Sequence, residues 1–209
     1  MKTKLMTATM FAVCSMFALS SCDKEEDDNT PIAEGTFYFE ADMDGKSLYL
    51  PEGKDGYTSK AFVQTEATTA GCTEIQFMQV AKSNDIKKSI EIAFIEQRNS
   101  CTTDCTQSKT MLQTGDYSFG RLETFSDKPM QDGVVIRYTD IYGKVWSTDF
   151  GTADQSNGSF NVTNVSANTA DSKSQLLATA EFNCTLYDKA GNQIVITNGE
   201  IVSRSIVCE

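Results

Sequence analysis

The segment Phe37-Tyr-Phe-Glu-Ala-Asp-Met-Asp-Gly-Lys-Ser-Leu-Tyr-Leu50 has the pattern of a β-hairpin. From residue 37 to residue 43 every second side chain is apolar, which is the period of a strand that buries one face. Asp44-Gly45 favours the tight two-residue turn that joins antiparallel strands, and residues 46–50 form a matching second arm. The segment therefore predicts two paired strands with one face directed into a core.

The same two-residue period recurs along the rest of the chain. It predicts further strands at 60–66, 74–81, 89–96, 134–142, 145–150, 158–165, 176–187, 193–197 and 200–208, with a shorter extended stretch at 115–120. Turn pairs separate several of them, among them Asp132-Gly133 and Asn198-Gly199. We expect an all-β fold, an antiparallel β-sandwich of about 11–13 short strands. A closed calycin-like β-barrel is the alternative.

The first 21 residues have the order of a secretory signal. Lys2 and Lys4 precede an apolar stretch from Leu5 to Leu19, and two serines follow it. This stretch is shorter than the roughly 20 apolar residues that a helix needs to cross a bilayer. Residues 1–21 are therefore predicted to be a cleaved lipoprotein signal peptide rather than a membrane span.

Leu19-Ser-Ser-Cys22 resembles the bacterial lipobox. The resemblance implies cleavage before Cys22 and attachment of fatty acyl chains to Cys22, which would hold the mature protein in a membrane. The six residues that follow resemble the export signal of Bacteroides-type surface lipoproteins: Asp23, Lys24, Glu25, Glu26, Asp27 and Asp28. That resemblance implies an outer-membrane protein that faces the cell exterior. A solvated, extended tether is the plainer interpretation of the same charges.

Composition narrows the possible functions. Removal of Lys2 and Lys4 with the leader leaves 16 basic residues against 29 acidic ones, a net charge of −13, so nucleic acid is not an expected partner. The chain has no histidine, which removes Ser-His-Asp and Cys-His catalysis and histidine-ligated zinc. No break in composition divides residues 35–209. We therefore expect one β domain there, behind a disordered tether at 22–34.

Five cysteines remain besides Cys22 and the one in the leader: Cys72, Cys101, Cys105, Cys184 and Cys208. In an exported protein such cysteines can form disulfides. The spacing of Cys101 and Cys105 would let a disulfide close a short loop. Free thiols and a metal site are the alternatives at this pair, although the metal site lacks a second pair of ligands. An odd count leaves at least one thiol unpaired.

Two aromatic residues are candidates for ligand contact. Trp146 is the only tryptophan, and Tyr142 lies close to it in the sequence. Aromatic rings with polar neighbours can stack on sugar rings, whereas the alternative is that Trp146 fills the core, as large aromatic side chains mostly do. No catalytic residue, no metal site and no cofactor is predicted.

The segment Phe182-Asn-Cys-Thr-Leu-Tyr-Asp-Lys-Ala-Gly-Asn-Gln-Ile-Val-Ile-Thr-Asn-Gly199 resembles the closing part of small β-rich lipoproteins from Bacteroides-type bacteria. Tyr138-Thr-Asp-Ile-Tyr-Gly143 and Gly115-Asp-Tyr-Ser-Phe119 fit the same pattern. The shared features are strands and turns, and the family has no established activity. The resemblance therefore implies fold and location only.

We expect a non-catalytic, surface-exposed outer-membrane lipoprotein that binds a glycan or a protein partner, or serves in envelope assembly. Two alternatives stay open. A calycin-like carrier of an apolar ligand would require a roomy interior. A carboxylate-dependent glycan hydrolase would require two acids that face each other across a cleft.

Overall fold

The computed structural model describes residues 37–68, 71–82, 85–100, 110–122, 129–167 and 176–205. All of them belong to one unit, Ala33–Glu209. The predicted signal peptide and tether, residues 1–34, lie outside the described residues, and so do Cys101 and Cys105.

Eleven strands form within the described residues. They are β1 (Tyr38–Met43), β2 (Lys46–Pro51), β3 (Tyr57–Thr68), β4 (Gly71–Lys82), β5 (Asp85–Arg98), β6 (Gly115–Asp116), β7 (Gly133–Thr139), β8 (Val145–Ser147), β9 (Ser159–Ala167), β10 (Leu176–Tyr187) and β11 (Gln193–Ser205). The predicted all-β fold is confirmed, because nearly all of the regular structure is strand.

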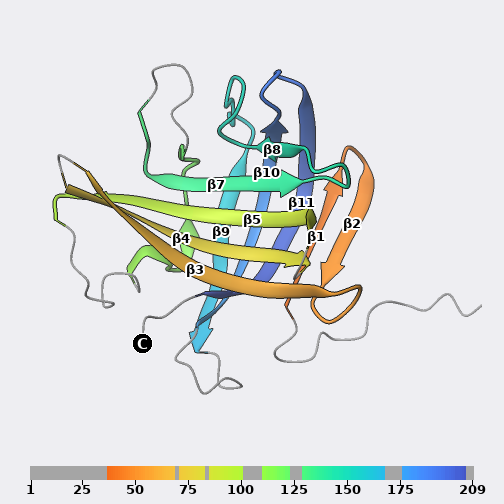
Figure 1. Ribbon diagram of the computed structural model, residues 1–209, viewed down its shortest axis with the longest axis horizontal. Coiled ribbons are helices and arrows are strands. Elements are labelled where there is room, and N and C mark those ends of the chain that lie inside the picture. Colours follow the sequence, from red (N-terminus) through yellow and green to blue (C-terminus); the bar gives the residue numbers. More distant parts are fainter. Residues whose placement is uncertain are drawn as a thin grey trace, which may run out of the picture. The chain divides into compact units, whose positions relative to one another are not determined.

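Antiparallel pairings join these strands into one sheet. The order is β2-β1-β11-β10-β8-β7-β5-β4-β3, while β9 pairs with β10 and β6 pairs with β9. In Figure 1, β3, β4, β5 and β7 run across β9, β10 and β11, so the sheet has two crossing arms. The sheet curls into a half-barrel, which is intermediate between the predicted sandwich and its barrel alternative.

A column of aromatic rings fills the core between the two arms. Phe182 of β10 stacks between Phe39 of β1 and Phe160 of β9, with ring centroids 6.1 Å and 5.7 Å apart. Phe94 of β5, on the other arm, meets Phe160 edge to face at 5.7 Å. All four rings are buried. Since aromatic pairs stabilise a core beyond their buried area, this column ties the arms together.

A polar corner joins β3 to β11, although the two strands are not neighbours in the sheet order. Ser59 Oγ and Ser203 Oγ lie 2.9 Å apart. The guanidinium of Arg204 donates to the carbonyl oxygen of Ser59 at 2.9 Å and to Glu52 Oε1 at 2.6 Å. These contacts keep β3 against β11 and so stabilise the curved shape of the sheet.

The predicted turn at Asp44-Gly45 is present. Both residues have positive φ angles, 49° and 74°, which a type I′ turn requires. Asp44 Oδ1 also accepts a hydrogen bond from the backbone N–H of Val195 at 2.9 Å. The turn residues therefore both reverse the chain and fix the hairpin against β11.

The prediction of a turn at Asn198-Gly199 is wrong, because these residues form a β-bulge inside one continuous strand, β11. The pairing with β10 shifts register between Phe182 and Cys184, opposite the bulge. Asn198 has a positive φ of 52°. A bulge and a tight turn both need a residue with a positive φ angle, so Asn-Gly is equally compatible with either of them.

Asp132-Gly133 is not a hairpin turn either, because Gly133 begins β7. A Cβ at Gly133 would lie 2.4 Å from the carbonyl oxygen of Ser118, and its φ is 131°. Asp132 Oδ1 accepts a hydrogen bond from the backbone N–H of Gln97 at 2.9 Å. The glycine is needed here for close approach of two chain segments rather than for chain reversal.

The bulge depends on the missing side chain of Gly199. A Cβ there would lie 2.7 Å from the Phe182 ring, which is itself held between Phe39 and Phe160. We expect Gly199→Ala to lower the free energy of unfolding by about 1–3 kcal/mol, measured by urea denaturation. Thr197→Ala, at an exposed position of the same strand, should leave the midpoint nearly unchanged. An unchanged midpoint for Gly199→Ala would contradict this account of the bulge.

Candidate functional site

Strands β4, β5 and β7 carry apolar side chains on both faces. One face contributes to the core, and the other, here called the outer face, carries a second apolar cluster. Its members are Ile75, Phe77, Ala93, Ile95 and Val135. Leu122 and Met130, from the chain between β6 and β7, pack against this cluster. Part of the outer face is therefore covered by a segment that belongs to no strand.

A groove of about 320 Å³ opens on the outer face. At one end Phe62 of β3 and Phe77 of β4 are register partners, and their rings stack with centroids 4.4 Å apart. Phe77 is buried, whereas Phe62 is 39% exposed. Leu122 and Met130 of the covering segment also line the groove. The exposed Phe62 ring is therefore held in place by the buried Phe77 ring, and the pair is here called the Phe62 platform.

The groove also carries charged groups. The register of the strands places Gln79, Glu91 and Arg137 side by side across β4, β5 and β7. Gln79 Nε2 donates a hydrogen bond to Glu91 Oε2 at 3.3 Å. Glu91 and Arg137 both line the groove, so a carboxyl and a guanidinium group stand near the aromatic platform.

Asp149 lies behind this charged row, and its oxygens are already engaged. The backbone N–H of Leu122 donates to Oδ2 at 3.0 Å, and the hydroxyl of Ser147 donates to Oδ1. Arg137 Nη2 lies 3.6 Å from Oδ2. A buried carboxylate requires such partners, because an isolated charge in the interior is costly. Asp149 therefore fastens the covering segment to the sheet and orients Arg137, and it does not line the groove.

The environment of Glu91 favours its neutral form. Burial raises the pKa of the Glu91 carboxyl, and the nearby Arg137 guanidinium offsets only part of that effect. A carboxyl whose pKa is raised by folding contributes stability below its unfolded pKa, and this contribution is lost as the pH rises through the folded pKa. Ionised Glu91 therefore lowers the stability of the fold.

We expect Glu91→Gln to raise the urea midpoint at about pH 8 and to change it much less at about pH 4, where the wild-type carboxyl is largely protonated. Glutamine removes the ionisation but keeps an acceptor for Gln79. Glu181→Gln, at an exposed position of β10, is the matched control and should show no comparable gain. An equal gain from Glu91→Gln at both pH values would rule out ionisation as the cause.

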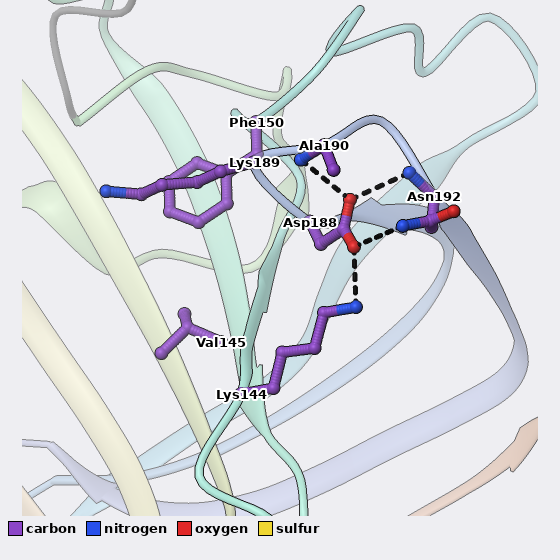
Figure 2. Close-up of a pocket in the computed structure, with 7 residues that line it drawn as sticks. All are labelled: Lys144, Val145, Phe150, Asp188, Lys189, Ala190 and Asn192. Atoms are coloured by element: carbon purple, nitrogen blue, oxygen red, sulfur yellow. Dashed lines mark hydrogen bonds and ion pairs between the residues drawn. The ribbon is translucent and has the colours of Figure 1, made fainter.

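A second depression, of about 560 Å³, lies beside β8 and the β10–β11 turn (Figure 2). Four dashed lines in Figure 2 converge on the carboxylate of Asp188. It accepts hydrogen bonds from Ala190 N at 2.9 Å and from Asn192 N and Nδ2 at 2.7 Å and 2.6 Å. Lys144 Nζ lies 2.5 Å from its Oδ2. Hydrogen bonds from Asn192 and Lys144 hold the pKa of Asp188 well below its ordinary value.

This second depression is better explained as a structural element than as a binding site. The one carboxylate that lines it is used by its own turn and by Lys144 of the neighbouring chain segment. In Figure 2 the side chain of Lys189 crosses the Phe150 ring, and its amino group points away from Asp188. Lys189 Nζ lies 5.3 Å from the centroid of that ring. The contacts fasten the turn after β10 to the chain around β8.

The two aromatic candidates from the sequence have different environments. Trp146 is 9% exposed, donates from Nε1 to Asp140 Oδ2 at 3.3 Å, and has Lys144 Nζ 4.0 Å from its ring centroid. Tyr142 lies in the turn between β7 and β8 and is 84% exposed. Neither residue lines the groove on the outer face.

The predicted anchor and loop disulfide are not tested by the structure. Cys22, the acidic run 23–28, Cys101 and Cys105 lie outside the described residues and stay predictions. Of the described cysteines, Cys184 is a buried free thiol whose pKa is raised by burial. Cys72 is disulfide-bonded.

The sequence did not identify Phe62, Glu91 and Arg137 as site residues. Each occupies an ordinary position in a predicted strand, and only the pairing of β3, β4, β5 and β7 brings them to one groove. One local signal was present: Phe77 and Met78 are adjacent apolar residues that break the alternation of β4. Such a break indicates a strand that is buried on both faces.

Compared with known proteins, the chain matches no family model, no curated protein and no solved structure. In the described part of the chain, no helix is long and apolar enough to cross a membrane. Across the same residues, no group of three or more His, Cys, Asp or Glu side chains is placed to bind a metal ion. A proposal for the function of the groove therefore rests on the chemistry of its own residues.

Proposed function

We propose that this protein is a non-catalytic, lipid-anchored binding module of the outer membrane, exposed to the cell exterior, that holds a glycan in the groove on its outer face. The Phe62–Phe77 stack is the observation that carries the proposal. An exposed aromatic ring fixed on a buried one offers a flat apolar surface, which suits the apolar face of a sugar ring.

Polar groups around the platform support a glycan rather than a purely apolar ligand. Gln64 and Glu66 follow Phe62 on the same face of β3 and also line the groove. Gln64 Nε2 donates to Glu66 Oε1 at 2.6 Å, which orients both side chains. Together with Glu91 they provide donors and acceptors for hydroxyl groups. A groove of about 320 Å³ is at the small end of ligand pockets, in keeping with one or two sugar units.

The arrangement of the acids supports binding without cleavage. Hydrolysis of a glycosidic bond needs two carboxyl groups on either side of the bond. Glu66 and Glu91 both line the groove, but the register places them six residues apart along the strands, about 20 Å, which is beyond the separation that hydrolysis uses. Asp149, the acid behind Arg137, has partners at both oxygens and is buried. The carrier alternative has less support, because large side chains such as Phe160 and Phe182 fill the space between the arms.

The Phe62 platform is tested by glycan binding. We expect Phe62→Ala in the full-length protein to weaken binding to its best glycan on an array about tenfold, because the change removes about 0.5–1.5 kcal/mol of stacking together with the apolar area that the ring buries. Tyr49→Ala, which removes another exposed aromatic ring from β2 on the other arm, should bind as wild type does. Equal binding by wild type and Phe62→Ala would contradict the proposed groove, as would wild type that binds no glycan.

The lipid anchor is tested by Cys22→Ser. We expect this variant to lose palmitate incorporation and to leave the membrane fraction, because the acyl chains need the cysteine thiol and stable anchoring needs more than one chain. Replacement of Asp23, Glu25 and Glu26 by alanine should keep the lipid but reduce protease access on intact cells. Palmitate label that persists in Cys22→Ser would contradict the anchor, and unchanged access in the alanine variant would contradict the export signal.

A further inference from the structure

Strand β3 has one long edge that no other described strand pairs with. It is last in the sheet order and pairs only with β4, with continuous register from Tyr57 to Thr68. At the start of β3 this unpaired edge is occupied, because the side chains of Glu52 and Arg204 form hydrogen bonds with the backbone of Ser59. Beyond Ser59 that edge is open within the described residues.

The contacts of Ser59 show which backbone groups face the open edge. Its N–H donates to Glu52 Oε1 at 3.1 Å and its carbonyl oxygen accepts from Arg204 Nη1 at 2.9 Å, both on the side away from β4. In an antiparallel sheet the two polar groups of one residue point the same way, and every second residue repeats that direction. The N–H and C=O groups of 61, 63 and 65 therefore face outward.

Apart from the charges of Lys60 and Glu66, this edge lacks the features that usually prevent strand addition. Residues 60–66 read Lys-Ala-Phe-Val-Gln-Thr-Glu, with no proline, and the register with β4 has no bulge. Unpaired edges of this length and regularity act as templates for another strand. The charges at the two ends, Lys60 and Glu66, are equally distant from Val63.

We propose that a second copy of this chain pairs with this edge, β3 to β3 and antiparallel, about a two-fold axis at Val63. In that register Lys60 lies opposite Glu66 of the second copy, and the reverse pair forms by symmetry. A shift of two residues in either direction loses both charge pairs. The self-complementary sequence thus selects a second copy and one register. The inference goes beyond the proposed function and does not depend on it.

The hydrogen-bonding pattern fits the same register. Val63 lies opposite Val63 of the second copy, and Ala61 lies opposite Thr65, so each outward-facing residue has a partner and about six backbone hydrogen bonds form. Lys60 and Glu66 then occupy pairs without backbone hydrogen bonds, where side chains are closest. Pairing ends at Ser59, whose backbone already has partners.

Val63→Cys in the full-length protein on cells tests the axis. Facing α-carbons about 5.5 Å apart lie within the range of a disulfide, so mild oxidation should give a covalent dimer on a non-reducing gel. Val195→Cys is the matched control, because Val195 is 46% exposed on β11, far from β3 in the sheet order. A Val63→Cys dimer well above the control supports the pairing. No dimer, or an equal yield from both variants, would overturn it.

Charge reversal tests the register. In detergent, sedimentation of the full-length lipoprotein should show a dimer whose dissociation constant rises about tenfold in Lys60→Glu and in Glu66→Lys, because each change sets like charges opposite each other twice. The double variant restores opposite charges and should regain the wild-type dissociation constant. A wild type that sediments only as a monomer overturns the proposal, and so does a double variant no tighter than the singles.

Discussion

Contact between the aromatic rings of the two arms is the interaction on which the rest of this structure depends. One sheet has to curl so that its own inner face is buried, and the column of Phe39, Phe182 and Phe160 meets Phe94 of the opposite arm where the arms cross. The absent side chain of Gly199 leaves room for the central ring. Loss of this contact would expose apolar surface on both arms, since their inner faces pack against each other in one core.

The groove on the outer face follows from how the second apolar face is covered. A strand that is apolar on both faces needs a cover on each, and the chain between β6 and β7 supplies the outer one through Leu122 and Met130. One buried carboxylate, Asp149, holds that cover by accepting the N–H of Leu122. Phe62 belongs to the edge strand and keeps an exposed ring. The groove thus lies at the boundary between the covered and the uncovered part of the outer face.

Local patterns made much of the fold predictable, and long-range pairing made the site unpredictable. The hairpin around Asp44-Gly45 and the bounds of β10 follow from alternation and turn chemistry within a few residues. Asn198-Gly199 was misassigned because turn and bulge require the same positive φ. The groove depends on the register that sets Phe62 beside Phe77 and Glu91 beside Arg137, and nothing local encodes which strands are neighbours.

The anchor, the open edge and the groove reinforce one another if each acts as proposed. Six backbone hydrogen bonds add only a modest net stability in water, since each replaces a bond to solvent. Acyl chains at Cys22 would confine the copies to one plane and raise their effective concentration. Pairing of the two β3 strands at Val63 would then place one Phe62 platform on each side of the contact between the two copies. A glycan with repeated units could contact both, and two weak sugar contacts would hold far more firmly than one.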